Sequence, residues 1–482
     1  MRAYFRILLP AFFCAVCAWA KPPQTGIQVT TKSSQARSYF EQALAKQQTL
    51  HLEEALDGFH KAVQADPQFA LGHMLLSYFS QDPAEQVSER DKALASRELA
   101  SKEEQLIIDW LSDSSKGQWI PAIQAMNDLQ NTYKNHREIA WLSGMWLTNQ
   151  QQWGRAIEMY RRAIEIDGNF ADAWNSVAYC YARTRDFEKA FAAMKRYTGL
   201  LPREPNPQDS FAEISRMGGR YHAALVHYRA ALKLDPKFIS SQVGIADTYA
   251  LMGDEKRARA EYEAALKKTT DKVQGTLWAF QSAATYVREN NHSAADAAFQ
   301  AIARQAHKND LGNLEAEAYR SMSLYQKKGA TAMELLAKAE AVTHEDHKVS
   351  QALLDQEMAS ILRARVDRAV QEDDLDLASA SLKKLEALAN SSSDAAVALS
   401  YDGASGGVLL AQGSYAEAIS HLEEDDRNPF SMQRLVQAYE KSGAKDNAKH
   451  IAEDLAGFNE PSIEQAIVVP AFRKKLLQGG GH

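Results

Sequence analysis

Small residues recur every 34 positions along the middle of the chain, each within a stretch of apolar residues at helical spacing. Four such stretches between residues 150 and 275 align without gaps. A large side chain follows each small residue after four positions, and residues four apart share one face of an α-helix. The pattern therefore predicts amphipathic helices. The small residues are Ala156, Ala190, Ala224 and Ala258, and the large ones are Tyr160, Met194, Tyr228 and Tyr262.

Each cycle also holds a second helix and a helix end. Another small residue lies twelve positions before each marker alanine, and Gly, Pro or Thr lies twelve positions after it. Small residues let two antiparallel helices cross closely, and Pro or Gly ends a helix. One cycle therefore predicts a helical hairpin. The upstream residues are Gly144, Ala178, Ala212 and Ala246, and the helix ends are Gly168, Pro202, Pro236 and Thr270.

This pattern resembles the tetratricopeptide repeat family. The cycle that begins at Ala171 matches the family positions best. The resemblance implies an all-α fold: a right-handed superhelical solenoid of antiparallel helix pairs, in which each hairpin covers the apolar face of its neighbour. The matching residues of this cycle are Trp174, Val177, Ala178, Tyr181, Ala190 and Pro202.

Weaker copies extend the array in both directions, to about twelve repeats over roughly residues 33–460. Residues 351–370 read as one long helix. The predicted organisation is a signal peptide (1–20), a linker (21–32), N-terminal repeats with one degenerate pair (33–136), regular 34-residue repeats (137–272), divergent repeats (273–460), and a C-terminal cap and tail (461–482).

Composition agrees with a helical, folded chain. Apolar residues make up 45% of it, alanine alone accounts for 78 of 482 residues, and Pro and Gly number only 13 and 24. These proportions exclude the strand-rich classes, wholesale disorder and a polytopic membrane protein. The net charge of −7 argues against a nucleic-acid-binding protein, because binding the phosphates of a nucleic acid requires a basic surface.

The first 20 residues predict export. Arg2 and Arg6 precede an apolar run from Ile7 to Trp19, which ends in Ala18-Trp19-Ala20. This is the pattern of a secretory signal peptide, so we expect cleavage near Ala20 and a periplasmic or secreted protein. An uncleaved anchor is the alternative, although the run is shorter than the ~20 residues that span a bilayer.

Cysteine usage fits this expectation. Cys14 and Cys17 would leave with the signal, so Cys180 remains as a buried, inert thiol without a disulfide partner. The stretch 88–111 resembles repeat halves of some bacterial signalling proteins, which supports an exported bacterial type without transferring an activity.

A partner surface is expected on the first helix of each pair. In a solenoid these helices line the concave groove. With repeats that start at Arg137, Ala171, Pro205 and Ile239, their inward positions carry aromatic, thioether and charged side chains. Packing between neighbouring repeats is the alternative role for Trp141 and Tyr179. The expected partner-binding residues are Glu138, Trp141, Met145, Asn175, Tyr179, Arg183, Glu213, Arg216 and Asp247.

The resemblance also allows one ligand class to be tested. Repeats that clamp chaperone carboxyl termini require Lys and Asn at the fifth and ninth positions of a repeat. Here those positions hold Trp141 and Met145 in one repeat and Asn175 and Tyr179 in the next. We therefore expect no carboxylate clamp.

Two short motifs could carry other chemistry. Residues 403–407 (GASGG) match the G-x-S-x-G elbow around Ser405, but their Ala-rich flanks predict a helix rather than a strand and turn. His344 and His347 could suggest a metal, but they lack the spacing of the H-E-x-x-H helix, which favours a solvated turn. We expect no metal and no cofactor.

The sequence as a whole predicts a non-catalytic scaffold or assembly factor that binds proteins or peptides in a bacterial envelope, with self-association through end repeats as a further possibility. A hydrolase that uses Ser405 and a carbohydrate- or lipid-binding solenoid are the alternatives.

Overall fold

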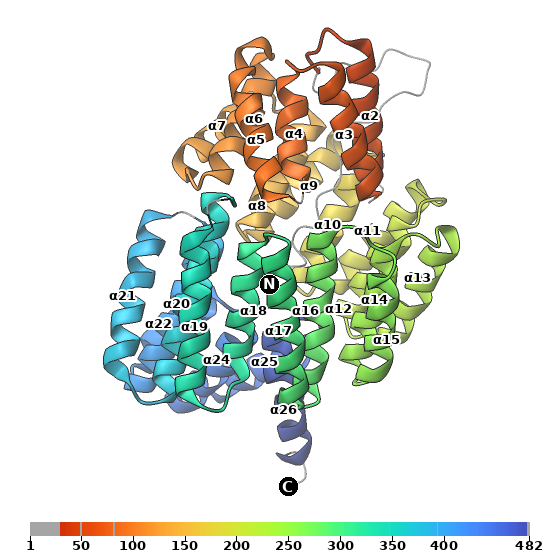
Figure 1. Cartoon of the computed structure of the whole chain (residues 1–482). Helices are drawn as coiled ribbons and strands as arrows, with labels where there is room; N and C mark the ends of the chain where they lie inside the picture. The colour runs from red at the N-terminus through yellow and green to blue at the C-terminus, as the bar shows by residue number, and fades with distance from the viewer. Residues whose placement is uncertain (1–28, 49–50, 81, 347, 393, 480–482) are drawn as a thin grey trace. The chain divides into compact units, whose positions relative to one another are not determined.

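The chain folds as pairs of antiparallel α-helices (Figure 1). A computed structural model describes residues 29–48, 51–80, 82–346, 348–392 and 394–479. Over this part of the chain there are 25 α-helices, one short 3₁₀ helix (η2, Arg97–Leu99) and no strand. The predicted all-α repeat of helix pairs is confirmed. The predicted signal peptide lies outside the described residues.

The first twelve helices form six hairpins. They are α2 (Ser34–Gln48), α3 (Leu52–Ala65), α4 (Ala70–Phe79), α5 (Pro83–Ala95), α6 (Lys102–Ser115), α7 (Trp119–Thr132), α8 (Arg137–Asn149), α9 (Trp153–Ile166), α10 (Ala171–Arg183), α11 (Phe187–Leu200), α12 (Asn206–Met217) and α13 (Tyr221–Leu234).

Six more hairpins and a final helix follow. They are α14 (Ile239–Leu251), α15 (Glu255–Leu266), α16 (Lys272–Arg288), α17 (His292–Lys308), α18 (Gly312–Tyr325), α19 (Gly329–Glu345), α20 (Gln351–Gln371), α21 (Leu375–Ser391), α22 (Ala395–Gln412), α23 (Tyr415–Glu424), α24 (Pro429–Ser442), α25 (Lys445–Ala456) and α26 (Ile463–Gly479). The long helix expected over 351–370 is α20.

The helices gather into two compact units, which are described separately. Unit 1 comprises Met1–Ser215, Ala223–Ser241 and Lys348–Ala352. Unit 2 comprises Arg216–His222, Gln242–His347 and Leu353–His482. Within the described residues, no helix combines the length and the apolar character needed to cross a bilayer.

The close helix crossing that the small residues predict is present in unit 1. A Cβ atom on Gly144 would lie 2.5 Å from a ring carbon of Tyr160, so the α8 backbone lies directly on that ring. Ala156, Tyr160 and Ala163 are buried on the facing side of α9. Only glycine fits at this crossing.

The turns inside several hairpins use a backbone conformation that the apolar pattern does not reveal. Gln151, Arg185, Gly219 and Gly253 all have φ between 55° and 82°, and they recur at the 34-residue spacing. The next residue bonds back to the helix that has just ended, as when the Asp186 amide donates to the Tyr181 carbonyl (2.8 Å). A residue in the left-handed conformation thus ends the first helix, and the chain reverses direction within a few residues.

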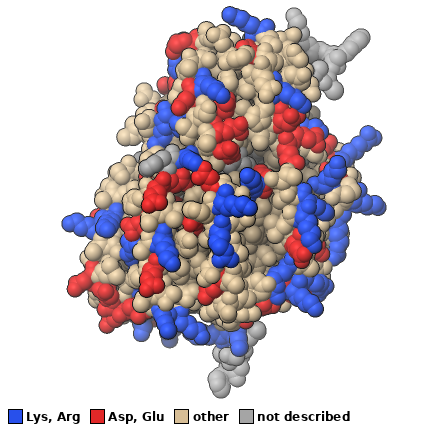
Figure 2. Space-filling model, viewed as in Figure 1, with Lys and Arg blue, Asp and Glu red and all other residues tan. Residues whose placement is uncertain are grey.

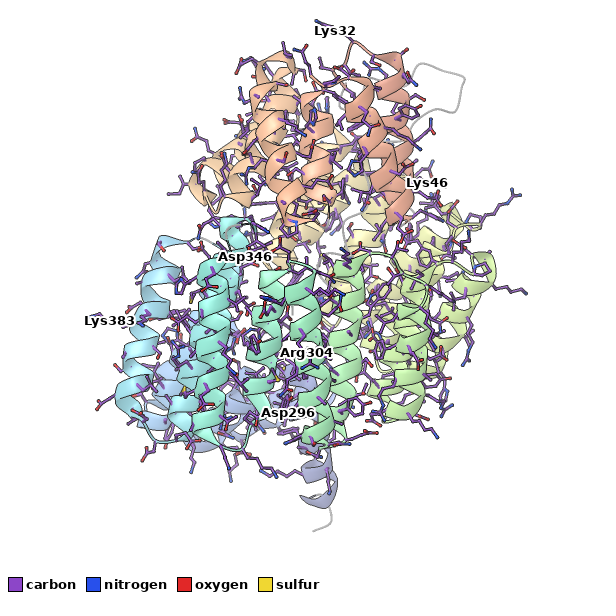
Figure 3. All side chains as sticks on the ribbon, in the orientation of Figure 1. Lys32, Lys46, Asp296, Arg304, Asp346 and Lys383 are labelled. Carbon is purple, nitrogen blue, oxygen red and sulfur yellow. The ribbon has the colours of Figure 1, made fainter. Side chains whose placement is uncertain are left out.

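Hydrogen bonds between pairs add to the apolar packing in unit 2. Asp296 on α17 accepts hydrogen bonds from Tyr325 and Gln326 at the end of α18, both at 2.9 Å. Figure 3 labels Asp296, together with Lys383 of α21, an exposed residue whose side chain projects away from the ribbon. Apolar and polar contacts thus act together between successive helix pairs.

Replacing Gly144 with alanine tests the close crossing. Gly144→Ala drives a methyl group into the Tyr160 ring, so we expect the free energy of unfolding to fall by about 1–3 kcal/mol. Gly154→Ala is the matched control, because no atom lies within 4 Å of its added Cβ. Its stability should be unchanged or up to about 1 kcal/mol higher. Urea denaturation followed by circular dichroism measures both, and equal losses would contradict the crossing.

Candidate functional site

Two of the predicted contact residues link neighbouring repeats in unit 1. The Trp141 indole N–H on α8 donates to Ser176 Oγ on α10 (3.0 Å), and the Tyr179 hydroxyl on α10 donates to Glu213 Oε2 on α12 (2.7 Å). Trp141 is 1% exposed and Tyr179 is 5% exposed. Their observed role is packing between repeats, and contact with a partner stays a prediction.

Acidic side chains lie near the start of three first helices of unit 1. Glu138, Asp172 and Asp209 lie in the first turns of α8, α10 and α12, where the positive end of the helix dipole favours a negative charge. Asp209 accepts a hydrogen bond from Ser241 (2.5 Å). Asp172 lies 34 residues after Glu138 and Asp209 lies 37 residues after Asp172, so these acids follow the repeat only approximately.

Burial sets the protonation of two of these acids. It raises the pKa of Asp172 well above its ordinary value, although nearby Arg137 opposes the shift. Burial also raises the pKa of Glu138, again against Arg137, whose Nε donates to Glu138 Oε1 (2.8 Å). The Arg137 guanidinium also pairs with Asp167 and lies over the Phe170 ring, 4.8 Å from its centroid. Arg137 thus supplies the positive charge beside both buried acids, Glu138 and Asp172.

The other predicted contact residues differ in exposure. In unit 1, Met145 and Asn175 are buried, whereas Arg183 and Glu213 are partly exposed. Arg216 and Asp247 belong to unit 2, where Arg216 Nη1 lies 3.7 Å from Asp247 Oδ2. Arg183 and Glu213 are therefore the members whose side chains can be changed without opening a core.

Close packing inside unit 2 explains why glycines surround Ser405. They lie inside α22, where a Cβ on Gly406 would meet Leu422 Cγ at 2.5 Å. A Cβ on Gly403 would clash with both Arg363 Nη2 and Asp425 Oδ2. Ser405 is 3% exposed in mid-helix, so the strand-and-turn setting of a nucleophile elbow is absent at this position. The glycines make room for α23 and for an ion pair.

That ion pair belongs to a buried charged cluster. Arg363 Nη2 on α20 lies 2.7 Å from Asp425 Oδ2 and donates to Ser431 Oγ on α24 (2.7 Å). Arg434 Nη1 lies 2.8 Å from Asp367 Oδ1, which joins the same two helices again. Burial raises the pKa of Asp425 even though Arg363 opposes the shift. The cluster connects α20 to α24 past the glycine side of α22.

The C-terminal segment is the part of the site that sequence patterns did not reveal. Helix α26 contacts α16 and α18 as well as α24 and α25. Asn459, just before it, accepts a hydrogen bond from the Tyr221 hydroxyl (2.5 Å) and donates to the Met217 carbonyl (3.3 Å). We call the surface formed by α16, α18, α24, α25 and the 217–221 turn the α26-binding surface.

Apolar side chains complete the contact. Val468 and Val469 of α26 are buried with Met432, Leu455 and Phe458. Helix α26 lies in the segment where the sequence predicts a C-terminal cap, and it also reaches α16 and α18 near the start of unit 2.

Metal and thiol chemistry gain no support. Among the described residues, no group of three or more His, Cys, Asp or Glu side chains is placed to hold a metal ion. His347 lies outside them, and His344 lies in the last turn of α19. Cys180 is buried, and burial raises its pKa to about 11, which disfavours the reactive thiolate.

Charge is mixed over the surface in view. Figure 2 shows side chains of both signs across this face. Salt at physiological concentration screens charge interactions beyond about 8 Å. A surface of mixed charge therefore exerts no long-range attraction on a strongly charged ligand.

Asp172 makes stability depend on pH. Its raised pKa in the folded state means that the folded chain holds a proton which the unfolded chain has lost, so its contribution to stability falls as pH rises above about 4. We expect Asp172→Asn to be more stable than the parent at pH 8, with the difference shrinking towards pH 5. Chemical denaturation at several pH values measures it.

The control for this variant is Asp186→Asn. The Lys189 ammonium and amide hold the pKa of Asp186 below its usual range, so its charge stabilises the fold and the variant should lose stability at neutral pH. A parallel pH trend in both variants would contradict the assignment.

Breaking the ion pair at Asp425 should be costly. Asp425→Asn removes the closer of two carboxylates from the buried Arg363 guanidinium and leaves Asp367 Oδ2 at 4.0 Å, and breaking a buried pair typically destabilises a protein by about 3–5 kcal/mol. Glu165→Gln removes a partner from the exposed Arg162–Glu165 pair and should change stability by less than about 1 kcal/mol. Equal effects in urea denaturation would show that the buried cluster is dispensable.

Comparisons with known proteins find partial similarities and assign no family. No family model matches it. It is 22% identical over 232 residues to Superkiller protein 3 of Schizosaccharomyces pombe, covering 46% of this chain and 17% of that protein. It is 24% identical over 160 residues to the general transcriptional corepressor trfA of Dictyostelium discoideum, covering 33% of this chain and 9% of that protein. The chain therefore spans less than a fifth of the length of either relative.

Solved structures show likenesses of the same kind. The Cut9–Hcn1 hetero-tetramer of APC/C matches with a TM-score of 0.43 and 13% identity, over 87% of this chain and 76% of that one. A tetratricopeptide repeat protein of Parabacteroides merdae matches with a TM-score of 0.36 and 12% identity, over 59% and 98%. A thermophilic tetratricopeptide repeat protein of Thermus thermophilus matches with a TM-score of 0.32 and 19% identity, over 38% and 98%. The fold assignment rests on the helix pairs themselves.

Proposed function

We propose that the chain is a non-catalytic scaffold or assembly factor that binds protein or peptide partners through the first helices of its repeats. One observation carries the proposal: a polypeptide segment of the chain itself, residues 458–476, already lies against such helices in unit 2. Side chains of these helices and of the 217–221 turn bind that segment through apolar, amide and backbone contacts, the contacts by which repeat surfaces hold peptides.

The proposal includes a site and a location. The partner site extends over the predicted residues of unit 1, among which Arg183 and Glu213 are partly exposed. The protein acts outside the cytoplasm, in the periplasm or after secretion, on the basis of the signal-like residues 1–20. No observation on the described residues favours the hydrolase or the carbohydrate- or lipid-binding alternative.

A paired capture experiment tests the function. The chain from residue 21 onward is immobilised beside the charge-swap variant Arg183→Glu/Glu213→Lys, which keeps the net charge and leaves Trp141 and Tyr179 in place. Because Glu213→Lys removes the acceptor of the Tyr179 hydrogen bond, circular dichroism first checks that the variant is folded. We expect at least one envelope protein to bind the parent and to bind the variant at least about tenfold more weakly, since losing about 1.4 kcal/mol of contact energy weakens binding tenfold.

The control is Lys383→Glu/Glu386→Lys, a charge swap on the outer surface of α21, and it should capture the same protein as the parent. If both variants capture the protein equally well, the partner site lies outside unit 1. If no protein binds the parent, the proposed function is wrong.

A further inference from the structure

The C-terminal segment makes contacts that resemble those of a bound ligand. Phe458 to Leu476 follows the last helix pair, and its helix α26 contacts helices from both the start and the end of unit 2 (Figure 1). A further repeat of the array would contact only the preceding pair, because each repeat of a solenoid contacts its neighbours alone. The segment instead lies on a surface shared by four helices.

Polar anchors hold the beginning of the segment. The Asn459 amide accepts from Tyr221 Oη and from Arg473 Nη2 (2.5 and 2.7 Å) and donates to the Met217 carbonyl (3.3 Å). Gly219, in the same turn, has φ +71°, and a Cβ there would lie 3.3 Å from Asn459 Nδ2. The turn between α12 and α13 keeps the conformation of the equivalent hairpin turns, and the absence of a side chain at Gly219 leaves room for the Asn459 amide.

Charge complements these anchors. Arg427 pairs with Glu460, and its guanidinium lies 5.5 Å from the centroid of the Phe458 ring. Burial lowers the pKa of the Arg320 guanidinium, but Glu357, Glu317 and Glu464 of α26 together raise it above its ordinary value. The segment thus places carboxylates near Arg427, in the loop before α24, and near Arg320 of α18.

The segment is a poor helix by itself. Pro470 lies inside α26 and follows Ile467, Val468 and Val469, three β-branched residues in a row. Proline removes a helical hydrogen bond, and β-branched residues lose side-chain freedom in a helix. An isolated helix of this length and composition is unstable in water, so α26 depends on the surface that it contacts. Its last turns, with Lys474, Lys475 and Leu476, are exposed.

We propose that the α26-binding surface is a site for an amphipathic helical peptide, and that residues 458–476 occupy it in cis as a removable ligand. This inference rests on the proposed function and adds its regulation. A partner segment would carry the same chemistry: an aromatic and an amide residue, an acid one turn later, and a pair of β-branched residues that enter the apolar cluster. It would bind only after the C-terminal segment leaves.

The test uses the full chain and a fluorescein-labelled peptide of residues 458–476. In the parent, the tethered segment has a high effective concentration and excludes the peptide. In Val469→Asp a charge replaces a fully buried valine, so the segment is released and the surface becomes available. We expect fluorescence anisotropy to show peptide binding at least about tenfold tighter to the variant than to the parent, because apparent affinity rises with the open fraction.

Two matched controls accompany this measurement. Ala471→Asp places the same charge on an exposed position of α26 and should bind the peptide as weakly as the parent. A labelled peptide that carries the Val469→Asp change should bind neither protein. Hydrogen exchange of the variant should show loss of protection in α26 alone, with α16, α18 and α24 still protected.

Two results would overturn the inference. One is a variant that keeps the protection of α16, α18 and α24, loses that of α26, and still does not bind the peptide. The other is a variant in which all four helices lose protection together, which would make α26 part of the core of unit 2. Capture of an envelope protein by the parent in either case would leave the proposed function standing.

Discussion

The structure depends on one constraint: a single helical hairpin cannot cover its own apolar face. Each pair must therefore pack on the next, and the small residues at the crossings set how closely it does so. Gly144 against Tyr160 in unit 1 and Gly406 against Leu422 in unit 2 are two versions of the same contact. Because every pair relies on its neighbours, stability is distributed along each unit rather than held in one core.

Polar side chains give this stack its register. Successive first helices are joined by single hydrogen bonds in unit 1, as between Tyr179 and Glu213, and by buried ion pairs in unit 2, as between Arg320 and Glu357 (2.7 Å). These buried groups must stay paired, because an unpaired polar group in the interior lowers the free energy of unfolding. The residues expected to receive a partner thus also hold the repeats together, and the same surface can serve both roles only where side chains remain partly exposed.

The sequence predicted the hairpins because their determinants are local. Helical spacing, a small residue and a helix breaker recur within each 34-residue cycle, and observed first helices begin at Arg137 and Ala171 as expected. The left-handed turn residues were missed, because Gln151 and Arg185 are not residues that normally mark such a turn. The contact between Tyr221 and Asn459 was missed for another reason: it joins residues 238 positions apart, and no periodicity relates them.

The central proposal is that the α26-binding surface of unit 2 binds polypeptide, with α26 as its present occupant. Native-state hydrogen exchange of the unaltered full chain, followed against low concentrations of urea, measures this most directly. We expect α26 to open at a lower free energy than α16, α18 and α24, as a separate step. A single opening free energy shared by all four helices would contradict it.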